Sequence, residues 1–319
     1  MKKTALFIGL STVFFSLMEI TLKSAGNAFN PIQINWIRFS IGGIVLLPFA
    51  IRSLRIQGQM LHWRDLKLFA LTGFTCLVVS MTLFQLSISY TQASTVAVVF
   101  SANPVFALIF SYLILHERLG RANFLAVIIS IIGLLVIVNP ANLTDPVGLT
   151  LAITSAMTFG LYSIISRYGS VHRGYNGIVM TCFTFLVGAV ELFVLIEITN
   201  IPTIAHAMKS VGWLSQFSAI PLFNNVNMHF FWMLFFVGVC VTGGGFAFYF
   251  LAMERSNVST ASLVFFIKPG LAPIFAALLI GDKIVLTTII GIVIIIFGSV
   301  VTFMGNRRRE GTHAKMGAD

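Results

Sequence analysis

The sequence has few charged residues and few cysteines for its length. Only 9% of its 319 residues are Asp, Glu, Lys or Arg, whereas a typical soluble domain has about a quarter. This shortage excludes a soluble globular protein, and a hydrophobic content of 57% excludes a disordered chain. Cys76, Cys182 and Cys240 each lie in an apolar stretch without metal-ligand spacing. We therefore expect neither a disulfide framework nor a metal site.

Motifs of membrane enzymes and of nucleotide-binding proteins are also missing. The chain contains no HExxH, no GxSxG and no phosphate-binding loop, so we expect neither an enzyme nor a cofactor. The formal net charge of +10 would suggest nucleic acid as a partner of a soluble protein. Here the basic residues are scattered between long apolar runs, which indicates membrane topology instead. We expect no nucleic-acid partner.

Long apolar stretches dominate what is present. A membrane-spanning helix needs about 20 largely apolar residues. The first stretch has some features of a signal peptide, but Glu19 inside it argues against cleavage. The sequence predicts an all-α integral membrane protein, embedded in the lipid bilayer, with ten transmembrane helices, at about 4–22, 32–51, 66–89, 92–115, 123–138, 147–166, 177–198, 231–252, 259–280 and 285–304.

The distribution of Lys and Arg predicts the orientation in the membrane. With the N-terminus in the cytoplasm, only Lys23, Lys209 and Lys283 fall on the outer side, and most other basic residues fall on the inner side. Because cytoplasmic loops carry an excess of Lys and Arg, we expect both termini in the cytoplasm. The predicted location is the inner (cytoplasmic) membrane, with segment 200–230 as an outer loop.

The chain also contains an internal repeat. Residues 90–137 align with 255–302 without a gap, so that Pro104 falls on Pro269 and Gly133 on Gly298. A weaker match relates the first predicted helix to the sixth. We expect two five-helix halves, 1–140 and 147–306, followed by a cytoplasmic basic tail at 307–319. Since five is odd, the second half is inverted, which is typical of alternating-access transporters with a substrate site between the halves.

The repeated residues resemble a known family. The segments Tyr90-Thr91, Asn103-Pro104-Val105-Phe106 and Leu115-His116-Glu117-Arg118-Leu119 resemble the EamA domain of the drug/metabolite transporter superfamily, and the second copy is similar. Arg38 also lies where this family commonly has an arginine. The resemblance implies ten helices in two inverted repeats, usually for export of amino acids or related metabolites. Phe15-Ser16 replaces the family's common Trp-Gly pair, and the outer loop is long, so the substrate is not carried over.

Ionisable residues inside the spans are the first candidates for a site, because each costs about 2.5–3.5 kcal/mol at the membrane centre. Glu19 and Lys23 are four residues apart, in the favourable order for a helix pair. The repeat aligns them with Thr158 and Tyr162 on a second polar stripe. These stripes predict the walls of one cavity. The alternative is that Glu19 and Lys23 neutralise each other and the hydroxyls bond to their own helix.

Lys268 is a second candidate, about nine residues or roughly 13 Å into its span. Asn103 is its counterpart in the first repeat. The alternative to a substrate-binding role for Lys268 is a structural ion pair with Glu191.

A proline follows each of these two residues. Pro104 and Pro269 each remove the backbone bond to the carbonyl four residues earlier. We expect kinks or hinges there, with free carbonyls at Phe100 and Phe265. Such breaks are common beside substrate sites in transporters.

Arg38 lies about 10 Å inside the outer boundary, where it either binds a carboxylate bidentately or bridges helices. Gln85 and Tyr249 complete the candidate set. These residues predict a small substrate with a carboxylate, most simply an amino acid or related metabolite, and Glu19 is a candidate carrier of a coupling proton. A flippase for a lipid-linked or amphiphilic substrate is the alternative. The sequence indicates no oligomeric state.

Overall fold

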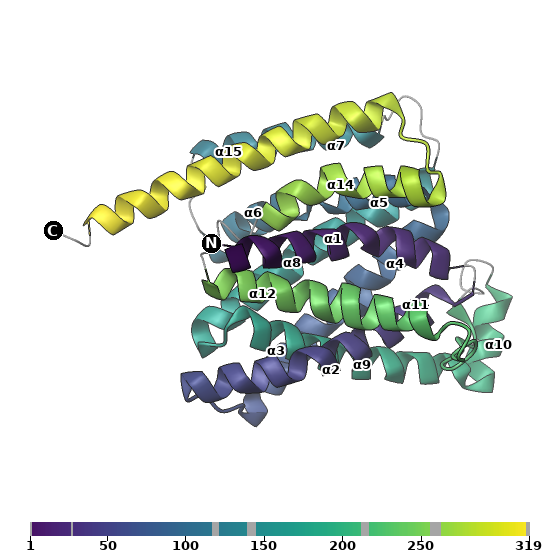
Figure 1. Cartoon of the computed structure of the whole chain (residues 1–319). Helices are drawn as coiled ribbons and strands as arrows, with labels where there is room; N and C mark the ends of the chain where they lie inside the picture. Colours follow the sequence, from purple (N-terminus) through teal and green to yellow (C-terminus); the bar gives the residue numbers. More distant parts are fainter. Residues whose placement is uncertain are drawn as a thin grey trace.

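The computed structural model describes residues 2–26, 28–116, 121–138, 145–211, 217–255 and 263–316. These residues form helices and no strands, as the sequence predicts. Most of the helices lie side by side in one bundle (Figure 1). Within the described ranges, seven helical stretches are long and apolar enough to cross a membrane, and shorter apolar helices lie at Val127–Ile137, Ile267–Ile280 and Leu286–Gly298. Ten spans in two inverted halves stay a prediction. The motif residues at 117–119 and 259–260 lie outside the described residues.

The N-terminal half begins with two long helices, α1 (Lys2–Ala25) and α2 (Pro31–Gln57). Asn30 caps α2 by accepting a hydrogen bond from the backbone nitrogen of Ile32, and Gly58 ends it in the left-handed conformation. The 3-10 turn η1 (Trp63–Asp65) leads into α3 (Leu66–Gly73), the π-helix η2 (Phe74–Met81) and α4 (Thr82–Tyr90). The half continues with α5 (Ala93–Phe100), α6 (Asn103–Leu115) and α7 (Arg121–Val138).

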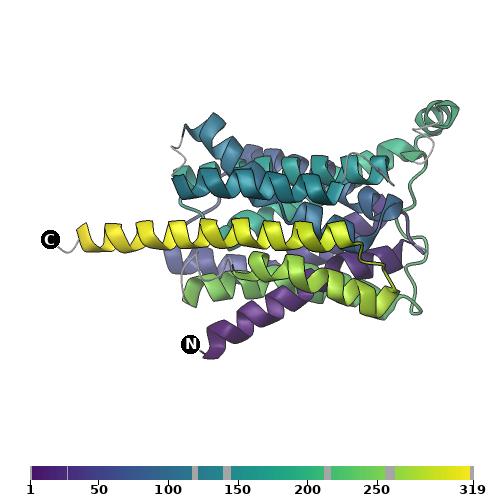
Figure 2. The same ribbon diagram turned by 90° about the horizontal axis from the view of Figure 1, so that it is seen from above.

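The C-terminal half follows a similar order. It contains α8 (Pro146–Arg173), α9 (Gly177–Asn200), α10 (Pro202–Ser210), α11 (Phe231–Phe235), the π-helix η4 (Phe236–Gly244), α12 (Gly245–Arg255), α14 (Leu263–Ile280) and α15 (Leu286–Met316). Helix α10 is added, and one continuous helix, α14, lies where the first half has α5 and α6. The helix α15 continues through most of the predicted basic tail and extends beyond the bundle (Figures 1 and 2).

Helices from the two halves alternate in the packing. α1 packs against α12 and α14, and α8 packs against α4 and α6. In the same way α2 packs against η4, while α9 packs against α3 and η2. α7 and α15 form a pair at one side of the bundle (Figure 1). The core is therefore built jointly by both halves.

The segment between α9 and α11 folds back over the nearby ends of α1 and α2. The side chain of Gln33 donates hydrogen bonds to the backbone oxygens of Leu222 and Asn224, at 3.1 and 2.7 Å. The ring of Phe230 packs edge-on against Phe29, with centroids 5.3 Å apart. The segment predicted as the outer loop 200–230 contains a helix, because α10 forms its first part and projects from the end of the bundle (Figure 2).

Candidate functional site

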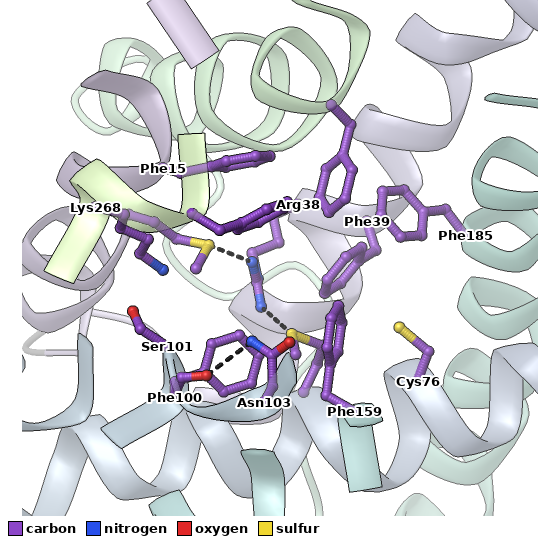
Figure 3. Close-up of a pocket in the computed structure, with 14 residues that line it drawn as sticks. Phe15, Arg38, Phe39, Cys76, Phe100, Ser101, Asn103, Phe159, Phe185 and Lys268 are labelled. Carbon is purple, nitrogen blue, oxygen red and sulfur yellow. Dashed lines mark hydrogen bonds between the residues drawn. The ribbon is translucent and has the colours of Figure 1, made fainter. Parts of the chain in front are cut away.

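A small cavity lies at the centre of the bundle (Figure 3). Its volume is about 50 Å³, which holds roughly four water molecules. Both halves of the chain contribute to its wall, and seven of the lining residues are phenylalanines. The lining residues are Phe15, Met18, Arg38, Phe39, Cys76, Met81, Phe100, Ser101, Asn103, Phe159, Phe185, Phe246, Phe265 and Lys268.

Arg38 extends from α2 into this cavity (Figure 3). Its side chain is 1% exposed, and its Nε and one terminal nitrogen donate to the Asn35 side-chain oxygen at 3.2 and 3.0 Å. The terminal nitrogens also contact the sulfur atoms of Met18 and Met81, at 3.6 and 3.5 Å, which are weak acceptors. The guanidinium carbon lies 4.2 Å from the ring centre of Phe39. Among the described residues no carboxylate forms an ion pair with Arg38.

Lys268 lines the same cavity and forms an ion pair with Glu19. Its Nζ donates to Glu19 Oε1 at 2.7 Å, and both side chains are at most 5% exposed. The second oxygen of Glu19 is buried without a hydrogen-bond partner among the described residues. Lys268 lies 5.6 Å from the ring centre of Phe100. The cavity therefore has one paired cation and one cation whose hydrogen bonds go to neutral groups.

Both ion pairs considered from the sequence are wrong. Lys23 does not neutralise Glu19: its Nζ donates to the backbone oxygens of Ile88 and Thr91, at 2.7 and 2.6 Å, and so caps the end of α4. Glu191 does not pair with Lys268: among the described residues the carboxylate within ion-pair distance of Lys268 is Glu19, and the Oε2 of Glu191 is buried without a hydrogen-bond partner. That oxygen lies beside the crossing of α3 and α9, away from the cavity lining.

The two prolines behave differently. Helix α5 ends at Phe100 and α6 begins at Asn103, so the span is broken just before Pro104. The expected free carbonyl of Phe100 is wrong, because the Asn103 side-chain nitrogen donates to it at 2.8 Å (Figure 3). Pro269 lies inside α14, which continues to Ile280 without a break. Of the two repeat-related prolines, Pro104 therefore lies in the first turn of a new helix and Pro269 lies inside a continuous one.

The remaining candidates lie outside the cavity lining. Thr158 donates to the backbone oxygens of Thr154 and Ser155 in its own helix, which was the alternative considered for the polar stripe. Tyr162 is buried with its ring 5.2 Å from that of Phe159, and Tyr249 packs against Phe265 at 5.2 Å. Gln85 is 1% exposed, and neither of its side-chain polar atoms has a hydrogen-bond partner among the described residues.

The aromatic residues of the wall were not predictable from the sequence. The chain contains 31 phenylalanines, and most lie in or next to an apolar stretch, so no local signal separates the seven in the cavity from the others. Position relative to the charged residues Arg38 and Glu19 was the usable signal. Phe39 follows Arg38 directly, and Phe15 and Met18 lie within one turn of Glu19 on α1.

Comparison with known proteins identifies the chain's relatives. Residues 2–139 and 146–304 each match the EamA-like transporter family. An uncharacterized transporter from Clostridium kluyveri is 32% identical over 97% of this chain and 95% of its own length. An S-adenosylmethionine uptake transporter from Rickettsia prowazekii is 26% identical over 50% of this chain and 52% of its own. A solved crystal structure matches 96% of this chain and 99% of its own, with a TM-score of 0.63 at 17% identity.

Proposed function

We propose a substrate class and a mechanism from one premise: the chain belongs to the EamA-like transporter family. It is a membrane transporter, and its family is one of transporters rather than enzymes. We propose that it carries a small organic carboxylate, most simply an amino acid or a related metabolite, across the cytoplasmic membrane. The proposed binding site is the central cavity, and the proposed direction is export.

The hydrogen bonding of Arg38 is the observation that carries this proposal. Burying a guanidinium inside a membrane protein costs free energy, so a buried arginine there indicates a functional role. The donors of Arg38 reach an amide oxygen and two thioether sulfurs, which satisfy a cation poorly. A carboxylate accepts two parallel hydrogen bonds from a guanidinium, and such charge-assisted bonds are roughly twice as strong as neutral ones. A substrate carboxylate therefore supplies what Arg38 lacks.

The ion pair beside the cavity is suited to a zwitterion. Glu19 does not line the cavity itself, but it pairs with Lys268, which does. When the cavity widens, the unpaired oxygen of Glu19 can accept from a substrate amine while Lys268 holds the other oxygen in place. The same carboxylate is a candidate carrier of a coupling proton. The phenylalanine walls favour an apolar side chain on the substrate, because they offer no further polar partners.

Alternating access between two inverted halves is the proposed mechanism. The exchanged helix contacts support it, because α1 with α12 and α14 corresponds to α8 with α4 and α6. The family matches each half separately, which is the pattern of an internal repeat. Both halves carry a π-helix at a similar position, η2 and η4, and such segments recur at functional sites. A cavity of about 50 Å³ must widen to accept an amino acid, which fits a closed state between two open ones.

Transport by purified protein in liposomes tests the carboxylate proposal. The panel contains radiolabelled L-methionine and L-phenylalanine, with their amides as unlabelled competitors. We expect the free amino acids to compete at least tenfold better than the amides. We expect Arg38→Met to remove this preference, and Arg38→Lys to retain part of it because the charge remains. Arg55→Met, an exposed position on the same helix, is the matched control and should transport normally.

Two results contradict the proposal. The first is equal competition by the amides, which would mean that no carboxylate is recognised. The second is unchanged transport in a correctly folded Arg38→Met variant, which would remove Arg38 from the site. Loading the substrate inside or outside the vesicles measures the direction, and an imposed pH gradient tests Glu19 as a proton carrier through the variant Glu19→Gln.

A further inference from the structure

A second and larger cavity lies at the C-terminal end of α2. Its volume is about 320 Å³, and it is formed where the last turns of α2 and α12 meet the beginning of α9. Two arginines line it, Arg52 from α2 and Arg255 from α12. They come from different halves of the chain. None of the lining residues in the described part of the chain is acidic.

The polar side of this cavity is held in place by local contacts. The Arg255 guanidinium lies 5.1 Å from the ring centre of Phe7, a distance typical of a cation–π contact. The side chain of Asn176 donates to the Ser53 hydroxyl and accepts from the backbone nitrogen of Val179, which caps α9. Ser53 and Asn176 both line the cavity. Fixed hydrogen-bonding groups in the same cavity as two cations favour an anion with several oxygen acceptors.

The other side of the cavity is apolar and continues to the outer surface of the bundle. Phe49, Ile56, Ile178 and Leu251 line it, and Ile56 is 73% exposed. Ile56 lies in the last turn of α2, a helix long enough and apolar enough to cross a membrane, so the apolar side of the cavity opens where that helix reaches the end of the bundle. The end of the bundle that carries Arg52 and Arg255 also carries Arg55, Arg64 and Arg173. Basic pockets between helices at such an end bind the head groups of anionic lipids.

We propose that this cavity binds the phosphate group of an anionic phospholipid. Arg52 and Arg255 hold the phosphate, Ser53 and Asn176 lie beside the head group, and the acyl chains leave along Ile56. The proposed lipid joins α2 to α12, which belong to different halves. It is a separate site from the central cavity, which Arg38 and Lys268 line.

Native mass spectrometry and thermal unfolding with added lipid test this site. The probes are palmitoyl-oleoyl phosphatidylglycerol, palmitoyl-oleoyl phosphatidylcholine and inorganic phosphate. We expect phosphatidylglycerol to remain bound and to raise the unfolding temperature, with phosphatidylcholine bound at least fivefold less. The double variant Arg52→Gln/Arg255→Gln should lose at least four fifths of the bound phosphatidylglycerol. Arg52→Lys/Arg255→Lys keeps both charges and should retain most of it.

The matched control is Arg55→Gln/Arg64→Gln, which removes two exposed arginines that do not line the cavity. We expect this control to bind phosphatidylglycerol as the unchanged protein does. An equal loss of lipid in the control would overturn the proposal, because any basic residue at this end would then suffice. Equal retention of phosphatidylcholine would also overturn it. A thermal shift with inorganic phosphate and none with phosphatidylglycerol would assign the cavity to a soluble anion instead.

Discussion

At the scale of single residues, the ion pair of Glu19 and Lys268 links the first helix of one half to the fourth helix of the other. Both groups are buried, so removal of either one leaves the other without its charged partner inside the bundle. The sequence indicated that each residue needs a partner in the membrane, because each lies inside an apolar stretch. It did not indicate which partner, since the two residues are 249 positions apart and Lys23 and Glu191 offered closer or equally plausible choices.

Removing one member of this pair should destabilise the protein. Lys268→Met keeps the apolar part of the side chain and leaves Glu19 buried and unpaired, which costs about 3–5 kcal/mol. We expect a clear drop in the unfolding temperature of the purified protein, together with loss of transport. The double variant Glu19→Gln/Lys268→Met has no unpaired charge at this position, so its stability should partly recover while transport stays low.

The control for this prediction is Glu191→Gln in the Lys268→Met background. It should restore nothing, because the Glu191 carboxylate does not contact Lys268. Rescue by Glu191→Gln, or normal stability and transport in Lys268→Met alone, would contradict the pairing.

At the scale of helices, glycines set how closely the two halves approach each other. A Cβ atom at Gly73 of α3 would lie 2.7 Å from the backbone nitrogen and 2.8 Å from the Cα of Gly188 in α9. Gly133 of α7 and Gly291 of α15 also lie at a close crossing, where an added Cβ atom would collide with the facing helix. Small residues at such crossings allow backbones to pack directly, which is a main source of helix association in membranes.

We therefore expect Gly73→Ala to lower the free energy of unfolding by about 1–3 kcal/mol, because the new methyl group meets backbone that cannot rotate away. Gly9→Ala on α1 is the matched control. A Cβ there has no neighbour within 4 Å, so its effect should be neutral or stabilising by up to about 1 kcal/mol. Thermal unfolding of both variants in the same detergent measures the difference. Equal destabilisation of the two would contradict the close crossing.

Helix positions were predictable from apolar length, and helix breaks were less so. The apolar stretch predicted at 32–51 became α2, which continues through polar residues to Gln57, and the stretch at 177–198 became α9, which continues to Asn200. Pro104 and Pro269 occupy equivalent positions in the repeat, yet only the first follows a break. The difference depends on the preceding side chain and on tertiary packing, because Asn103 bonds the free carbonyl while Lys268 extends to Glu19.

At the scale of the whole molecule, polar contacts join the two halves at the end where α2 and α8 finish. Asp65 is 1% exposed, and it accepts from the Tyr175 hydroxyl at 2.6 Å and lies 3.2 Å from the Nε of Arg173. Burial and this hydrogen bond raise the pKa of Tyr175 to about 12, so its hydroxyl stays protonated and able to donate at physiological pH. The side chain of Gln59 adds a hydrogen bond to the backbone oxygen of Gly174 at 3.0 Å.

The predicted orientation places this end in the cytoplasm. Met60 is 77% exposed beside these contacts, and Ser210 is exposed at the end of α10. In intact cells we expect a membrane-impermeant maleimide to label Ser210→Cys and not Met60→Cys. In inverted membrane vesicles the pattern should reverse, and the unchanged protein measures background from Cys76, Cys182 and Cys240. Labelling of Met60→Cys in intact cells would contradict the positive-inside assignment and the location of both termini in the cytoplasm.

The break before Pro104, without an equivalent break at Pro269, has a consequence for energetics. In a carrier made of two inverted halves, each half has one conformation in the inward-open state and another in the outward-open state. When the two halves swap conformations, one state becomes the other. If the halves were identical, the two states would therefore have equal free energy. A chain with one interrupted helix and one continuous partner lacks this equality. Each 1.4 kcal/mol of difference changes the ratio of the two populations tenfold. The unloaded carrier should therefore rest mainly with one face open, and substrate applied to that face should half-saturate transport at a lower concentration than substrate applied to the other.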